Sequence, residues 1–198
     1  MRNRFLLLCI AILLLSVLQS CSPEAPKFEA KDVSNVDHAK GFLLPDFNGN
    51  IKNLADFKGK VVIIFFGYTQ CPDICPTTLG ELVEVKKYLG SDANELQAIF
   101  VTVDPARDEA PMFKAYLSNF DPTFVALVPD AEQLKVVAKE YKVFYKKIPG
   151  PTPTSYSMDH SAGSYIYDQS GKLRLYARYG DRKSTRLNSS HITISYAV

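Results

Sequence analysis

A strong charge of either sign is missing from this 198-residue chain. It holds 23 basic and 21 acidic side chains, which gives a formal net charge of +2. Two of the basic residues, Arg2 and Arg4, precede an apolar run, and their removal with a leader would leave 21 of each sign. Because a nucleic-acid-binding domain normally carries a basic face, this balance argues against nucleic acid as a partner. With 46% apolar and 22% charged residues, one globular domain is expected.

Long apolar runs are scarce as well. The longest, from Phe5 to Leu15, is too short to favour a membrane-spanning helix. Its basic start and the small or polar residues that follow it indicate a secretory signal peptide over residues 1–20. The letters "LQSC" then resemble the lipobox of bacterial lipoproteins, so Cys21 is the expected lipid attachment site. An uncleaved anchor helix is the alternative. Either way, the domain is expected outside the cytoplasm, on the periplasmic side, anchored to a membrane.

Four cysteines are few, and two of them belong to this leader. Cys9 leaves with the signal peptide and Cys21 carries the lipid, so Cys71 and Cys75 remain as the free thiols. An even pair in an oxidising compartment forms a disulfide by default. Residues 21–40 are polar and lack apolar periodicity, which predicts a flexible tether between the lipid and the domain.

Residues 41–181 predict an α/β domain. The runs "VVIIFF", "LQAIFVTVD" and "TFVAL" are typical of buried strands, and helical apolar spacing follows each of them. A hairpin closes the pattern. Together with a cysteine pair at the start of the first helix, this order predicts a thioredoxin-like fold with a central mixed β-sheet flanked by helices. Residues 182–198, "RKSTRLNSSHITISYAV", contain no acidic side chain and no amphipathic period, and we expect them to be a non-native tail.

The two thiols stand in the segment "CPDIC". A three-residue spacer permits a disulfide and also lets two thiolates converge on a metal ion. Pro72 and Pro76 limit the freedom of the loop, and the positive end of the following helix favours the thiolate form.

A metal site needs at least one further ligand. Of the three histidines, His38 lies in the predicted tether and His191 in the suspect tail, whereas His160 precedes a predicted strand. In a thioredoxin-like fold the loop before that strand lies next to the cysteine helix. Two thiolates and an imidazole suit copper or zinc, and no second cysteine pair completes a structural zinc site. A structural disulfide with an unrelated surface histidine is the competing interpretation.

Three segments, "YTQCPDICPTTL", "VTVDPARD" and "MDHSAGSYIYD", resemble in order and separation the Sco/SenC family of thioredoxin-like copper proteins that serve cytochrome c oxidase assembly. The resemblance implies one copper ion, as Cu(I) or Cu(II), bound by Cys71, Cys75 and His160. It also implies a supporting role near the site for Asp104, by charge or hydrogen bonding. A loop over residues 148–156, mobile without metal, is expected to bring His160 to the thiols.

Two functions are open on this basis. In the first, the protein is a metallochaperone that delivers copper to the dinuclear copper centre of a cytochrome c oxidase subunit. In the second, Cys71 and Cys75 form a redox-active pair that reduces the copper-site cysteines of that subunit. The expected partners are this subunit, a copper donor or thiol reductant, and the membrane. A thiol peroxidase is less favoured because its peroxidatic cysteine needs neither a C-x3-C partner nor a distal histidine.

Overall fold

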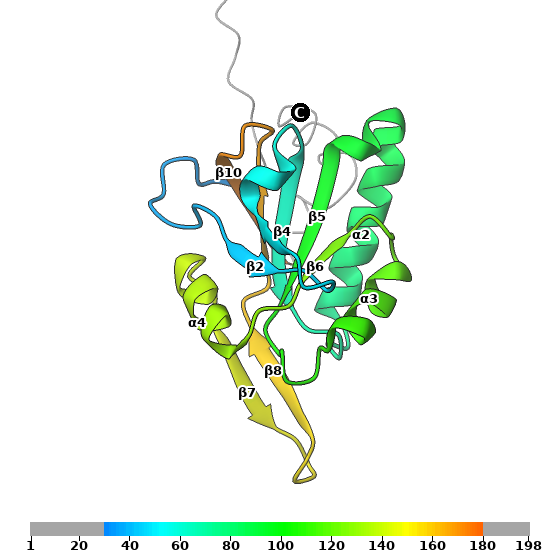
Figure 1. The fold of residues 1–198 in the computed structure, drawn as a ribbon, viewed down its shortest axis with the longest axis vertical. Helices are drawn as coiled ribbons and strands as arrows, with labels where there is room; N and C mark the ends of the chain where they lie inside the picture. Colours follow the sequence, from blue (N-terminus) through cyan, green and yellow to red (C-terminus); the bar gives the residue numbers. More distant parts are fainter. Residues whose placement is uncertain (1–29, 180–198) are drawn as a thin grey trace, which may run out of the picture.

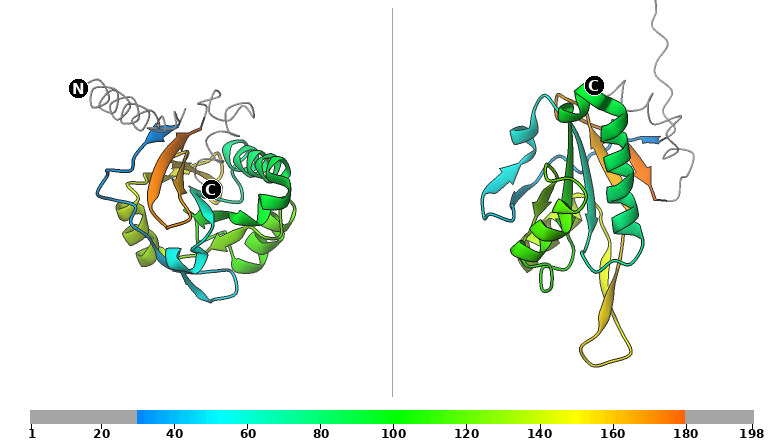
Figure 2. Two further views of the ribbon diagram at one scale, coloured as in Figure 1. Left: turned by 90° about the horizontal axis from the view of Figure 1, so that it is seen from above. Right: turned by 90° about the vertical axis from the view of Figure 1, so that its right-hand side faces the viewer.

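The computed structural model describes residues 30–179, which form a mixed six-stranded sheet with helices on both of its faces (Figures 1 and 2). The neighbours β4, β5 and β6 run parallel, whereas β9, β10 and β1 extend the sheet in antiparallel steps. In spatial order the strands are β1 (Lys31–Asp32), β10 (Leu173–Arg178), β9 (Gly163–Tyr167), β4 (Val61–Gly67), β5 (Leu96–Thr102) and β6 (Val125–Leu127). The predicted thioredoxin-like class and its mixed central sheet are confirmed.

The centre of the sheet is apolar throughout. All seven residues of β4 and all seven of β5 are buried, because helices cover both sides of this parallel pair. Each helix turns its apolar face to the sheet and its polar residues to solvent. The helices are α2 (Ile74–Leu89), α3 (Ala110–Ser118) and α4 (Ala131–Glu140); the short 3-10 helix η1 (Leu54–Phe57) precedes β4, and η2 (Gly90–Glu95) connects α2 to β5.

Local sequence signals mark the helix ends. Asp130 accepts hydrogen bonds from the backbone N–H groups of Glu132 and Gln133, and the Gln133 side chain accepts one from the Asp130 N–H, which completes a capping box at the start of α4. Gly90 ends α2 with φ +55°, a conformation that favours glycine. A small hairpin, β2 (Leu43–Pro45) and β3 (Ile51–Asn53), precedes the sheet.

Folded structure begins before residue 41, where the tether was expected to end. Lys31 pairs with Tyr176 as β1 adds to the sheet edge, and Ala39 is fully buried and accepts a hydrogen bond from the Tyr167 hydroxyl. This segment joins the fold by backbone pairing and a few small residues, so it carries no apolar period. The predicted signal peptide, Cys21 and the predicted tail lie outside the described residues. Between residues 30 and 179, no helix has the length and apolar content needed to cross a bilayer.

Residues 145–160, called the arm below, form a second departure from expectation. The loop expected over residues 148–156 is largely the turn at residues 150–155, but it closes an unexpected two-stranded antiparallel ladder of β7 (Tyr145–Pro149) and β8 (Tyr156–His160), which projects from the body of the molecule in Figure 1. Only residues 150–155 form its turn. His160 is therefore the last residue of a strand, held by pairing with Tyr145, rather than part of an irregular loop.

Candidate metal centre

The two cysteines lie where β4 passes into α2. The strand ends at Gly67, Cys71 stands in the connecting loop, and Cys75 is the second residue of the helix. Pro76 follows in the first turn, where a backbone N–H would have no helical partner and its absence costs little. Cys71 is 8% exposed and Cys75 1%, and both are free thiols.

Gly67 makes room for the second thiol. A Cβ atom at this position would collide with Sγ of Cys75 and with the ring of Phe100. The last residue of the central strand therefore has to lack a side chain for Cys75 to pack against the backbone there. The sequence signal for this was the glycine that follows "VVIIFF", which our sequence analysis did not single out.

His160 completes a group of three candidate ligands. The Sγ atoms of Cys71 and Cys75 and a ring nitrogen of His160 all lie within 4.8 Å of one another, and His160 Nε2 is 3.9 Å from Cys75 Sγ. His160 Nδ1 lies 3.0 Å from the backbone oxygen of Ser161. Because a carbonyl oxygen only accepts, Nδ1 carries the proton in this contact, and the lone pair of neutral imidazole is on Nε2, toward the thiols.

The pKa values of the two thiols are shifted in opposite directions. A hydrogen bond from the Cys75 thiol lowers the pKa of Cys71 well below its ordinary value, and interactions with His160 and with the backbone N–H groups of Cys75 and Asp73 add to this effect against the cost of burial. The same hydrogen bond, together with burial, raises the pKa of Cys75. Burial acts to lower the pKa of His160, but its interactions with Cys71 and with the Ser161 backbone outweigh burial and raise it. Of the two thiols, Cys71 is therefore the one whose thiolate form is favoured, and Cys75 the one that favours the proton.

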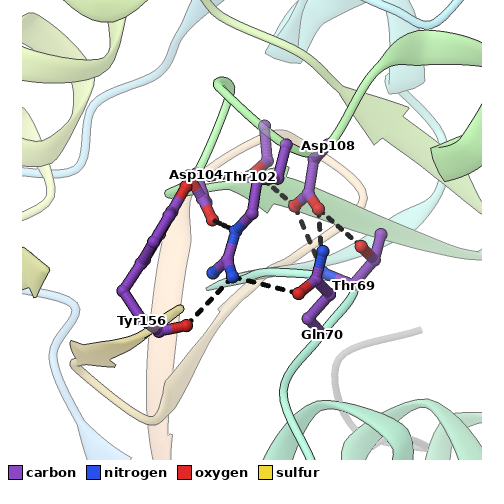
Figure 3. Close-up of polar contacts among 7 residues, drawn as sticks. Thr69, Gln70, Thr102, Asp104, Asp108 and Tyr156 are labelled. Atoms are coloured by element: carbon purple, nitrogen blue, oxygen red, sulfur yellow. Dashed lines mark hydrogen bonds and ion pairs between the residues drawn. The ribbon is translucent and has the colours of Figure 1, made fainter. Parts of the chain in front are cut away.

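A buried carboxylate, that of Asp108, is hydrogen-bonded to the loop that carries Cys71. Asp108 is fully buried, and it accepts hydrogen bonds from the backbone N–H and hydroxyl of Thr69 and from the hydroxyl of Thr102 (Figure 3). Thr69 stands two residues before Cys71, so this carboxylate fixes the loop that carries the first thiol. The segment "VTVDPARD" contains Asp108, but nothing in its local pattern distinguishes it from a surface residue.

Asp104 lies beside this network. Within residues 30–179 its carboxylate binds Arg107 and the hydroxyl of Tyr156, and it makes no hydrogen bond with any of the three candidate ligands. Arg107 in turn donates to the side-chain oxygen of Gln70, next to Cys71 (Figure 3). Any influence of Asp104 on the site therefore passes through these neighbours.

Three further residues were singled out in the sequence: His38, His191 and the predicted lipid attachment site Cys21. His38 belongs to the folded N-terminal segment rather than to a tether, and its buried Nδ1 atom has no hydrogen-bond partner among residues 30–179. His191 and Cys21 lie outside the described residues.

Fold and site together define a thioredoxin-like domain in which two cysteines at a helix start meet a histidine from the sheet side. A sequence model of the SCO1/SenC family matches residues 30–193. The chain therefore belongs to the SCO1/SenC family. The matched range includes part of the segment predicted to be a non-native tail.

Individual relatives agree with this assignment. A SCO2-like protein of Rickettsia felis is 37% identical over 154 residues, which cover 76% of this chain and 75% of the relative. The structure of Bradyrhizobium japonicum ScoI with copper bound is similar with a TM-score of 0.68 and 38% identity, over 78% of this chain and 96% of that one. The solution structure of apo Sco1 from Thermus thermophilus gives a TM-score of 0.72 and 30% identity, over 88% and 99% of the two chains.

Proposed function

We propose that this protein binds one copper ion through Cys71, Cys75 and His160 and delivers it to the dinuclear copper centre of cytochrome c oxidase during assembly. The observation that carries the proposal is the convergence of two thiols and one imidazole within 4.8 Å. Soft thiolates with an imidazole suit copper. Structural zinc normally takes four protein ligands, and within residues 30–179 the group contains three. The copper-bound Bradyrhizobium relative adds support.

The arrangement suits uptake followed by release. The thiolate form of Cys71 is favoured, so the proton that an arriving ion has to displace is chiefly that of Cys75, and Nε2 of His160 offers its lone pair. Metal affinity then depends on pH, because binding releases a proton. A client can take the ion by stepwise ligand exchange, in which the histidine from the arm leaves before the two thiolates of the buried loop.

A second function is favoured by the pairing of the thiols. Cys71 and Cys75 interact by a hydrogen bond that lowers the pKa of Cys71 and raises that of Cys75, which suits an attacking and a resolving thiol in a dithiol reductant. In this function the Cys71 thiolate attacks a disulfide of the oxidase subunit, and a mixed disulfide forms. Cys75 then displaces the reduced client, and the pair is left oxidised. A periplasmic thiol reductant would restore it, whereas the delivery function needs a copper donor.

Membrane anchoring belongs to the same proposal. We infer that residues 1–20 direct export and that Cys21 carries the lipid on the periplasmic side of the membrane. Asp104 is assigned a supporting role, which acts through Arg107 and Tyr156 rather than by metal ligation.

The test measures copper binding and oxidase assembly in the same variants. The reduced full chain is titrated anaerobically with Cu(I) and Cu(II), with Cys71→Ser and Cys75→Ser as controls that lack a thiolate. We expect one equivalent bound, a sulfur-to-copper charge-transfer band for Cu(II), and a weaker band and lower affinity in His160→Ala. Binding equal to that of the cysteine controls would contradict the metal site.

The two functions separate in cells that carry His160→Ala. Delivery predicts that copper affinity and oxidase assembly fall together, because the histidine is needed to load the ion. Reduction predicts that assembly survives the loss of copper affinity, because thiol exchange does not require His160 as a ligand.

A further inference from the structure

The ring of Tyr156, at the end of β8 next to the turn of the arm, has two cations against it. Arg107 Cζ lies 3.5 Å from the ring centroid and Lys147 Nζ lies 3.6 Å from it. The Tyr156 hydroxyl donates a 2.9 Å hydrogen bond to Asp104 Oδ1. The tyrosine is therefore held by both its ring and its hydroxyl.

Arg107 ties this tyrosine to the rest of the site. Its Nε is 2.5 Å from Asp104 Oδ2, and its Nη1 donates to the backbone oxygen of Tyr156 at 2.9 Å and to Gln70 Oε1 at 3.0 Å. One guanidinium thus connects three segments: the loop after β5, strand β8 of the arm, and the residue next to Cys71. Figure 3 shows Gln70, Asp104 and Tyr156 around these contacts.

The contacts between Asp104 and Arg107 are largely shielded from solvent. The Asp104 side chain is 5% exposed and that of Arg107 is 20% exposed, so water and salt screen this pair less than an ordinary surface ion pair. Cation–π contacts are likewise stronger when both groups lose water. Elsewhere the arm is attached by fewer polar contacts: four of the five residues of β7 and two of the five of β8 are exposed, while Tyr145 and Met158 pack against the core and Tyr68 has a hydrogen bond with the Met158 backbone.

Strand β8 links Tyr156, which makes these contacts, to His160, the candidate ligand. Side chains alternate along a strand, so Tyr156, Met158 and His160 share one face. The burial of β8 follows the same alternation, with these three residues partly buried and the two between them exposed. Whatever fixes Tyr156 against the body therefore also turns His160 toward the thiols.

We infer that Asp104, Arg107 and Tyr156 form a latch that holds the arm against the cysteine loop, and that opening of this latch is the step that releases His160 from copper. This inference rests on the proposed function, since it takes His160 to be a copper ligand. The three latch residues are positioning residues. They set the affinity and release rate of the ion without touching it.

The decisive change is Tyr156→Phe in the full chain. It removes the hydroxyl bond to Asp104 and leaves the ring between the two cations. We expect a lower copper affinity and faster transfer to a competing chelator, on the order of tenfold, as is usual when a residue behind a metal ligand is lost. Arg107→Lys keeps the charge but loses the forked hydrogen bonds, so it should act in the same direction.

The matched control is Tyr145→Phe, which deletes a hydroxyl from the same arm outside the latch. It should bind and release copper at the native rate. If Tyr145→Phe and Tyr156→Phe behave alike, the latch is overturned, because the effect then belongs to the arm in general.

A double-mutant cycle identifies the route of the effect. In the His160→Ala background, Tyr156→Phe should change copper release no further, because the ligand through which the latch acts is already gone. An undiminished effect in that background would overturn the inference, since the hydroxyl would then act on the cysteines.

A measurement on the metal-free protein keeps the latch testable apart from copper. Hydrogen exchange at the amides of residues 156–160 should speed up on the order of tenfold in Tyr156→Phe, as local opening becomes easier, and not in Tyr145→Phe. Unchanged exchange would contradict the latch even if copper binds as proposed. Faster exchange with no copper bound by the native chain would instead show that the latch exists and that the proposed function has failed, so that His160 release is not its role.

Discussion

The cysteine end of the site and the arm that carries His160 are built in opposite ways. Behind the cysteines, every residue of β4 is buried, and Asp108 fixes the approach to Cys71 from within the core. In the arm, the turn over residues 150–155 is largely exposed, and the attachment consists of the polar contacts of Tyr156 and the packing of the partly buried Tyr145 and Met158. A site with one rigid half and one lightly held half can bind an ion firmly and still give it up through the weaker half.

The largest expected difference between the two halves is in local stability. Amides of β4 should exchange with solvent only on global unfolding, whereas arm amides should exchange by local opening that costs several kcal/mol less. At about 1.4 kcal/mol per tenfold, this is a thousandfold or more in protection. Native-state hydrogen exchange on the metal-free full chain measures it. Equal protection in β4 and β8 would remove the contrast on which the release order depends.

The next effect concerns the reactivity of the cysteine end. Because the pKa of Cys71 is lowered, its thiolate fraction stays near its maximum as the pH falls through neutrality, whereas an ordinary thiol loses about tenfold per pH unit below its pKa. Alkylation of Cys71 by iodoacetamide, followed by mass spectrometry, should therefore change little between about pH 6 and pH 8.

The control for this reactivity is Cys75→Ala. It removes the thiol that donates to Cys71, so the pKa of Cys71 should rise and the alkylation rate should become pH-dependent. A steep pH profile in the native protein would mean that the two thiols are not the unlike pair described above.

A smaller effect tests how tightly the rigid half is packed. Gly67→Ala should destabilise the fold by about 1–3 kcal/mol, because the added methyl overpacks the space of Cys75 and Phe100. Gly80→Ala in α2 is the matched change, since a Cβ there meets no atom within 4 Å, and it should stabilise the helix by about 0.5–1 kcal/mol. Denaturant unfolding of both variants gives the two signs. If Gly67→Ala leaves the free energy of unfolding unchanged, the Cys75 thiol can move aside, and the cysteine end is less rigidly packed than its burial indicates.

The smallest effect is a pH dependence at Asp108. Burial raises the pKa of this carboxyl, although hydrogen bonds from Thr102 and Thr69 oppose the rise. The folded state therefore holds the proton more tightly than the unfolded chain, and the stability that Asp108 contributes falls as the pH rises from the unfolded value of about 3.9 through the raised folded value.

Asp108→Asn removes this titration. The stability of the native protein relative to the variant should thus be greatest below about pH 4 and decline toward neutrality. Urea unfolding at several pH values measures the difference. A difference that grows with pH would mean that the hydrogen bonds of Asp108 outweigh its burial.

Much of the fold could be predicted because its signals are local. Continuous apolar runs marked the buried strands, and Asp130 with Gln133 marked the start of α4. The arm escaped prediction for a physical reason. Strand β7 carries Lys146, Lys147 and Pro149 and faces solvent, so it lacks both the apolar alternation and the continuous run that identify a strand, and β8 alternates over only five residues. The N-terminal strand was missed because edge pairing needs only backbone groups.

The candidate site divides in the same way. The sequence by itself determined the chemistry: two thiols at one helix start, one histidine outside the tether and tail, and a match of three segments to a family. Only the tertiary structure decided which side chains hold the thiols and the histidine in position. Asp108 meets Thr69 across 39 positions and Tyr156 meets Asp104 across 52, and no periodicity of 2 or 3.6 residues encodes such pairs. Because these contacts exist only when distant segments pack together, the orientation of His160 toward the thiols is a property of the folded chain.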